Sequence, residues 1–263
     1  MSNSFQCTQC GKCCIGLHIP LSIQESILWI SRGHHVKILV EAIPWIPNQT
    51  LSDDTLKRKE KITFSAISGT LPIRVQVTLV GYFMEACPNL DSHNRCGIYD
   101  QRPMTCRVYP FELNPSIALD PSNKLCPTEA WDLSRSVPNV QSKTSLQISI
   151  IDTQTQNVID AIHQTNINEV KLKEYLCVAL GIQTCSLSND GYLFHIVAQQ
   201  KLLECLESLT KLNDTQRHSR SEPIPSWLIL SKSEETRQNL SEIGAFCYSN
   251  SDVDGEKEYI HFS

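Results

Sequence analysis

Apolar residues in the first third of the chain follow helical spacing and then strand-like spacing. Ser22 and Glu25 form a capping box, and isoleucines recur at near-helical intervals after it, so a helix is predicted from Ser22 to a stop at Gly33. Residues 34–42 and 73–80 are rich in β-branched residues, and the second run alternates apolar with other residues. Both runs therefore predict strands.

Polar segments and turn residues separate these elements. Residues 52–61 carry charges of both signs and predict a solvated loop or a short helix. Residues 91–94 predict a turn, and Pro103 marks the start of a short helix that carries Cys106 and Arg107.

Apolar stripes continue in the second half of the chain. Residues 132–143 are polar and contain Pro138, so we place a domain boundary there. Beyond it, apolar positions at 172–180 and at 193–209 predict two helices, and Gly181 suits the end of the first.

The C-terminal segment predicts one more helix and a hairpin. Ser231 and Glu234 have the spacing of a helix cap. Residues 245–248 and 259–262 are predicted to pair as two strands across Asp254-Gly255.

These patterns predict an α+β fold with two domains. Residues 1–130 are expected to form a small N-terminal domain of short helices and strands. Metal bound by the cysteines is expected to hold this domain together. Residues 131–263 are expected to form a mainly helical C-terminal region whose role the sequence leaves open.

Composition narrows the class of protein. The 263 residues are 41% hydrophobic and carry a net charge of −5, which favours a packed core and disfavours a broadly basic nucleic-acid surface. Neither an export signal nor a membrane-spanning apolar run is seen in the sequence, so a reducing cytoplasm without membrane association is the expected location.

Cysteine is the informative residue type. The chain has 12 cysteines, and clustered thiols in a cytosolic chain indicate metal binding or redox chemistry. Residues 7–14 read Cys-Thr-Gln-Cys-Gly-Lys-Cys-Cys. Cys7 and Cys10 can reach one metal centre from a single turn, and Gly11 permits that turn. The side chains of the adjacent Cys13 and Cys14 tend to point apart, so both would be strained as ligands of one metal ion. The loop therefore needs thiols from another part of the chain, or it divides its own thiols between two metal centres.

A second cysteine group can supply that sulfur. A hairpin between Cys87 and Cys96 would bring both sulfurs to the same end of that hairpin. The helix after Pro103 could place Cys106 next to them. Cys126 is an eighth thiol in the region. Eight thiols allow two four-sulfur sites, holding either zinc or iron–sulfur.

These motifs carry a family resemblance over roughly residues 5–130. The pattern Cys-x-x-Cys-Gly-x-Cys-Cys, followed by Cys-x8-Cys-x-Ile-Tyr-x-x-Arg-Pro-x-x-Cys-Arg-x-Tyr-Pro-Phe, resembles the YkgJ-type cysteine-cluster family. The resemblance implies a zinc- or iron-chelating domain that is often described as containing an iron–sulfur cluster. The ligands it implies are Cys7, Cys10, Cys13, Cys14, Cys87, Cys96 and Cys106, with Cys126 matching a later family cysteine.

Other residues near the motifs have two interpretations each. His18 and His93 could add metal ligands, although a loop histidine is more often solvated. Arg102 and Arg107 could offset thiolate charge or pair with nearby carboxylates. For Cys177, Cys185, Cys205 and Cys247 the favoured interpretation is structural, as small apolar residues.

The expected function is a metal-binding role with an all-thiolate centre. An iron–sulfur cluster, for example [4Fe–4S], is the favoured cofactor, since adjacent cysteines suit a multi-iron cluster better than one tetrahedral ion; zinc is the alternative. The role would be redox, metal handling or cluster holding. Alternatives are a cluster-dependent enzyme resembling a flagellin lysine methylase and a structural zinc module. The partner is an unidentified protein or small-molecule substrate, and whether the chain is an enzyme stays open.

Overall fold

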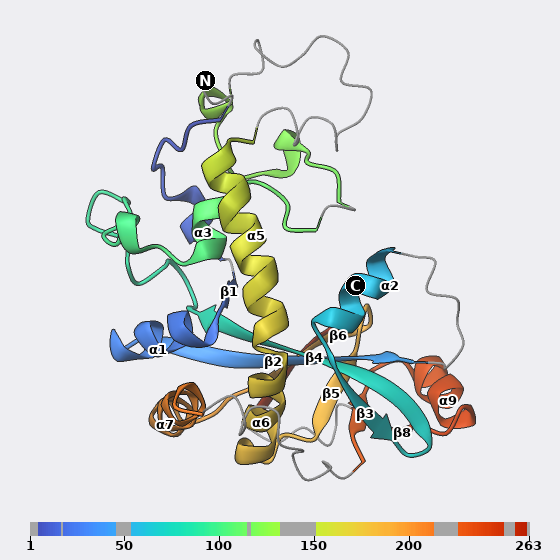
Figure 1. The fold of residues 1–263 in the computed structure, drawn as a ribbon. Helices are drawn as coiled ribbons and strands as arrows, with labels where there is room; N and C mark the ends of the chain where they lie inside the picture. The colour runs from blue at the N-terminus through green and yellow to red at the C-terminus, as the bar shows by residue number, and fades with distance from the viewer. Residues whose placement is uncertain are drawn as a thin grey trace. The chain divides into compact units, whose positions relative to one another are not determined.

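A computed structural model describes residues 5–16, 18–45, 54–114, 117–131, 151–212, 226–249 and 256–261 (Figure 1). The chain divides into two compact units, each built from separate stretches of sequence. Unit 1 contains residues 1–21 and 82–165, and unit 2 contains residues 22–81 and 166–263. The chain thus leaves unit 1 after its first 21 residues and returns to it 60 residues later.

Unit 1 is made of short elements and one long helix. Its strand β1 spans Ile19–Leu21 and its helices α3 and α5 span Met104–Val108 and Thr153–Asn168, the last three residues of α5 falling in unit 2. Four 3-10 turns complete the described part: η1 (Lys12–Cys14), η2 (Tyr99–Gln101), η3 (Pro121–Asn123) and η4 (Thr128–Ala130).

The core of unit 1 is small and partly aromatic. Phe5 packs against Phe111 and Trp131, with ring centroids 5.7 Å and 4.9 Å away. Ile159 and Ile162 of α5 are buried in the same cluster. The amide of Gln6 donates a 2.9 Å hydrogen bond to the carbonyl of Ala130, which fixes the N-terminal segment on this core. A core of this size gives limited hydrophobic stabilisation.

Unit 2 is built on a mixed β-sheet. Its strands in the described residues are β2 (His35–Pro44), β3 (Phe64–Ser68), β4 (Leu71–Tyr82), β5 (Thr184–Leu187), β6 (Gly191–His195), β7 (Leu228–Leu230), β8 (Phe246–Tyr248) and β9 (Lys257–His261). Alternate residues of β4 are buried, as expected for a strand with one face on the core.

The sheet has a parallel centre and antiparallel additions. The order β4-β2-β5-β7-β8 runs along it, and β2-β5, β5-β7 and β7-β8 are parallel pairs. Ile38 and Leu39 in the middle of β2 pair antiparallel with β6, which in turn pairs with β9, and β3 forms a hairpin with β4. Parallel neighbours must be joined by crossover segments, and α9 (Glu234–Glu242) is the crossover between β7 and β8.

The other helices of unit 2 are α1 (Ile23–Ser31), α2 (Asp54–Lys61), α6 (Val170–Leu180) and α7 (Gln199–Thr210). The capping box predicted at Ser22 and Glu25 is confirmed, and Gly33 has a positive φ of 83° after the helix. The end of α6 at Gly181 is also confirmed, with φ at 69°. Helix α6 lies next to α7, on one side of the sheet in Figure 1.

The prediction of a mainly helical C-terminal region is wrong. Strands β5–β9 all lie within residues 131–263, and the fold is a mixed α/β arrangement rather than the α+β fold that we expected. Leu193 belongs to β6 and not to a helix. These strands are three to five residues long, so no local run of alternation marks them. Their partners lie far away in the sequence, and tertiary pairing overrides weak local signals.

Two details at the C-terminus are also corrected. The cap of α9 is Ser233, whose side chain accepts from the amide of Thr236, and not Ser231. Strand β8 pairs in parallel with β7, and β9 pairs with β6, so the predicted hairpin does not form. Its turn, Asp254-Gly255, lies outside the described residues.

Two expectations remain, one about the domain boundary and one about membrane-spanning helices. The predicted boundary at 132–143 lies outside the described residues, so the division into 1–130 and 131–263 stays a prediction. Across the seven described ranges, no helix combines the length and apolar character needed to cross a bilayer.

Candidate metal site

The first cysteine loop is shaped by Gly11. This residue has φ at 71° and precedes the turn η1, in which the amide of Cys14 donates a 2.9 Å hydrogen bond to the carbonyl of Gly11. Cys7 and Cys10 are exposed, whereas Cys13 and Cys14 are half-buried. The loop therefore presents its first two thiols outward and turns the second two toward the rest of unit 1.

The second cysteine group folds as the predicted hairpin. Leu90 and Cys96 form an antiparallel bridge, and the amide of Gly97 donates a 2.7 Å hydrogen bond to the carbonyl of Asn89. The tip is the predicted turn. There the Asp91 carboxylate accepts from the amides of His93 and Arg95, at 2.8 Å each, which lowers the pKa of Asp91.

Backbone contacts join the two cysteine groups. The amide of Cys87 donates a 2.7 Å hydrogen bond to the carbonyl of Cys14. On the other side, Gly11 lies against the hairpin turn so closely that an added Cβ would stand 2.4 Å from the carbonyl oxygen of Asn94. The glycine is thus required both by its φ and by this close approach.

Cys106 and Cys126 approach from two further segments. Cys106 lies on α3, the short helix predicted after Pro103, which is confirmed, and Cys126 borders the aromatic core of unit 1. The hydroxyl of Tyr109 accepts from the amide of Leu125 at 2.9 Å, which holds the Cys126 segment near α3.

The thiols are close enough to influence each other's ionisation. A hydrogen bond from Cys14 lowers the pKa of Cys13 to about 7, and the same bond raises that of Cys14. Burial raises the pKa of Cys106 to about 12, with Cys87 and Cys13 adding to the effect. Burial likewise raises the pKa of Cys126 to about 12, and Cys13, Cys7 and Cys10 contribute.

Positive charge reaches the cluster from Arg102. Its guanidinium lies 3.7 Å from the centroid of the Tyr99 ring and donates to the Tyr99 carbonyl at 2.9 Å. The same charge adds to the lowering of the pKa of Cys13 and offsets part of the rise in the pKa of Cys106. This arrangement corresponds to the predicted offset of thiolate charge. Arg107 is exposed on α3, where it makes a helical backbone hydrogen bond to Pro103.

The two candidate histidines lie at the edge of this region. The His18 ring stacks on Tyr82 with centroids 6.2 Å apart, and His93 is exposed at the hairpin tip beside Ser92. Of the other four cysteines, Cys177 and Cys185 are buried as expected for core residues, and Cys205 and Cys247 are half-buried. All four belong to unit 2.

Asn89 is a site residue that the sequence analysis did not single out. Its side-chain amide donates to the Cys87 sulfur at 3.8 Å, and its carbonyl closes the hairpin. The signal available in the sequence is the Cys-x-Asn spacing, since a short amide two residues after a thiol can turn back to it.

No ready-made metal-binding geometry is present among the described residues. In those ranges no group of three or more histidine, cysteine, aspartate or glutamate side chains is arranged to hold a metal ion. The donor chemistry nevertheless fits a thiophilic metal, since eight thiols lie in one unit and the charge of neighbouring thiols raises the pKa values of Cys14, Cys106 and Cys126. Binding and the final arrangement of such ligands are coupled processes.

Comparison with known proteins identifies the region that carries these thiols. Residues 6–127 match the CxxCxxCC family model, described as "Putative zinc- or iron-chelating domain". The resemblance predicted from the cysteine spacing is confirmed over this range. Neither the curated proteins nor the solved structures searched contain a match to the chain.

Proposed function

We propose that the matched domain, residues 6–127, holds an iron–sulfur cluster and serves a redox, metal-handling or cluster-holding role. The observation that carries the proposal is the hydrogen-bonded pair Cys13 and Cys14, since the pKa of Cys14 is raised further by the charges of Cys87 and Cys106. Two adjacent cysteines with two further thiols nearby are difficult to arrange as ligands of one tetrahedral ion. They are easier to arrange around a cluster of several iron atoms.

The residues that would hold the cluster come from both cysteine groups. They are Cys7, Cys10, Cys13, Cys14, Cys87, Cys96, Cys106 and Cys126. A bound cluster supplies one-electron redox chemistry at a potential set by its surroundings. The chain's own part would be to orient the thiols through the Cys14–Cys87 backbone link and to offset negative charge with Arg102.

Metal analysis after anaerobic purification tests the identity of the centre. From iron-replete cells the full chain should be brown, absorb broadly in the visible range and contain iron and acid-labile sulfide. Colourless protein with stoichiometric zinc and no sulfide would overturn the iron–sulfur assignment and favour a structural zinc module.

Cysteine variants test whether the two groups form one site. Cys10→Ser and Cys96→Ser should each reduce metal content by half or more and should destabilise unit 1. Cys205→Ser is the matched control, because Cys205 is half-buried on α7 in unit 2. Full metal content in Cys96→Ser would show that the hairpin group is not needed for binding.

A further inference from the structure

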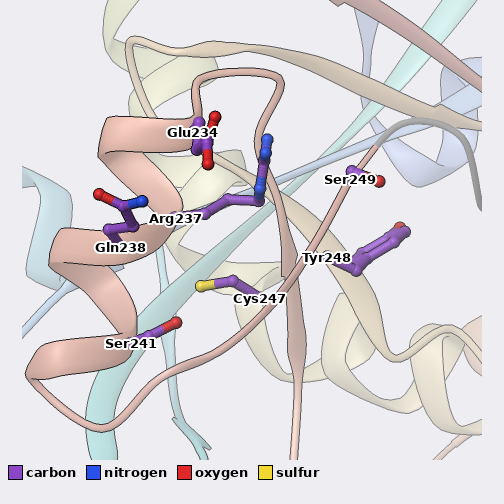
Figure 2. Close-up of a pocket in the computed structure, with 7 residues that line it drawn as sticks. All are labelled: Glu234, Arg237, Gln238, Ser241, Cys247, Tyr248 and Ser249. Atoms are coloured by element: carbon purple, nitrogen blue, oxygen red, sulfur yellow. The ribbon is translucent and has the colours of Figure 1, made fainter.

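Unit 2 contains a polar cavity that is separate from the cysteine motifs. It lies between α9 and the end of β8 and has a volume of about 450 Å³ (Figure 2). Glu234, Arg237, Gln238 and Ser241 line it from one face of α9, since they recur at intervals of three and four residues. Volumes of this size are typical of small-molecule sites, at ~300–1,000 Å³.

The topology of the sheet places this cavity where ligands commonly bind. Strands β7 and β8 are parallel and are joined by α9, so the first turn of α9 and the residues after β8 meet at the carboxyl ends of the strands. Tyr248 and Ser249, at the end of β8, line the cavity. In open α/β sheets, ligands bind outside the carboxyl ends of the strands.

Arg237 is held in place by the backbone beside the cavity. Its Nη1 donates to the carbonyl oxygens of Ser231 and Lys232, at 2.8 Å and 2.9 Å. These two bonds use one nitrogen of the guanidinium, and among the described residues Nε and Nη2 have no hydrogen-bond partner and can face a ligand. A guanidinium fixed in this way is preorganised to bind a carboxylate through two parallel hydrogen bonds.

Two observations indicate that this positive charge acts within the cavity. In Figure 2 the Arg237 side chain leaves α9 on the side that faces β8, and the Cys247 sulfur points from β8 toward α9. The charge also opposes the rise in the pKa of the Cys247 thiol that burial causes, as does a hydrogen bond with Ser241.

Glu234 adds the opposite charge to the same wall. It lies one helical turn before Arg237, and within the described part of the chain neither side chain belongs to an ion pair. The cavity therefore presents one cationic and one anionic group that do not neutralise each other. A simple anion such as phosphate would gain from Arg237 but be repelled by Glu234.

We propose that the cavity between α9 and β8 binds a small zwitterion of the α-amino-acid class, with its carboxylate on Arg237 and its ammonium group on Glu234. Gln238 and Ser241 are the polar side chains of α9 that line the cavity beside this charged pair and could contact a side chain of the ligand. The inference concerns unit 2 alone and is independent of the metal centre proposed for unit 1.

Titration calorimetry on the full chain tests this assignment with three matched probes. L-Glutamine carries both charges, 4-carbamoylbutanoate lacks the ammonium group, and 4-aminobutanamide lacks the carboxylate. Glutamine should bind at least about tenfold more tightly than either partner compound, because each analogue leaves one charge of the site unmatched. Absence of glutamine binding, or equal binding of the carboxylate or of inorganic phosphate, would overturn the zwitterion assignment.

Variants of the two charged residues make the test specific to this cavity. Glu234→Gln should remove the preference for glutamine over 4-carbamoylbutanoate, whereas Glu235→Gln, in the same helical turn but outside the lining, should retain it. Arg237→Gln should abolish binding of both carboxylates. Glutamine should also slow alkylation of Cys247, measured by peptide mass mapping. An unchanged preference in Glu234→Gln would contradict the proposal even if Arg237→Gln disturbed the loop that it holds.

Discussion

The backbone amide of Cys87 donates a 2.7 Å hydrogen bond to the carbonyl of Cys14, although 73 positions separate the two residues in the sequence. This bond places the CxxCxxCC loop directly beside the second cysteine group. Gly11 makes the second close approach, at the turn that ends with Asn94. The two motifs are therefore parts of one structural element, and changes in the contacts between them should affect both.

Gly11→Ala is expected to destabilise unit 1 and to lower its metal content. The new Cβ would stand 2.4 Å from the Asn94 carbonyl oxygen, and an L-residue with φ at 71° costs ~1–2 kcal/mol in addition. Gly16→Ala is the control, since Gly16 has φ at 68° but nothing within 4 Å of an added Cβ. Denaturant unfolding and metal analysis should show a larger loss for Gly11→Ala. Equal losses would mean that the approach to Asn94 has no role.

Arg102→Gln should weaken the cysteine site more than Arg107→Gln. Removing the Arg102 guanidinium from the Tyr99 ring costs ~0.5–1 kcal/mol of stacking and withdraws positive charge from Cys13 and Cys106. Arg107 is exposed on the same short helix. We expect faster metal loss to a chelator from Arg102→Gln at neutral pH. Identical chelation rates in the two variants would show that the charge at Arg102 is not used.

Glu169→Ala should be strongly destabilising, because Glu169 makes two buried contacts. One carboxylate oxygen accepts from the amide of Ile23 at 2.8 Å, and the other lies 3.1 Å from the ammonium of Lys173. Removing one partner of a buried pair costs ~3–5 kcal/mol. Glu174→Ala, which removes a more exposed pair with Lys171, should cost less than about 1 kcal/mol. Chemical denaturation of both variants measures the difference.

Glu41→Gln should stabilise the protein above neutral pH. Burial raises the pKa of Glu41, and the charge of Lys59 offsets only part of that rise. The folded state therefore binds the proton more tightly than the unfolded state, so the wild-type protein loses stability as pH rises through the window above the ordinary carboxyl pKa. The glutamine variant lacks this loss.

The pH dependence of the Glu41→Gln effect is the decisive measurement. The thermal unfolding temperature of the variant should be higher than that of the wild type at pH 8. The difference should shrink toward pH ~4, where the carboxyl also protonates in the unfolded state. Glu207→Gln, at an exposed position on α7, should show no such trend. A difference that grows on acidification would have the wrong sign and refute the explanation.

Local sequence signals were sufficient for the cysteine hairpin and for α1 but not for the sheet of unit 2. Ser22 and Glu25 satisfy each other within one turn, and the Asp91 turn closes on its own amides, so these elements follow from neighbouring residues. Strand β5 has four residues and owes its conformation to β2 and β7. Its pairing depends on contacts that no local pattern encodes.

The site shows the same limit in another form. Spacing alone indicated the eight thiols and the turn at Gly11, because those features lie within short motifs. The contact between Gly11 and Asn94 and the hydrogen bond from Asn89 to Cys87 depend on how the two motifs pack. The opposed charges of Glu234 and Arg237 were missed because surface charges on a helix usually face solvent, and only the position of β8 gives them a shared cavity.

The interleaved chain path has a consequence for synthesis on the ribosome. Strand β2 leaves the exit tunnel long before β5, since Val40 and Ser186, which share a hydrogen bond, are 146 residues apart. The apolar strands β2 and β4 therefore lack their C-terminal partner strands while residues 82–165 are translated and pack with residues 1–21. Such distant pairing slows folding and leaves strand edges exposed to aggregation. The time needed to translate residues 82–183 therefore sets how long, at least, the first strands of the nascent sheet remain without β5.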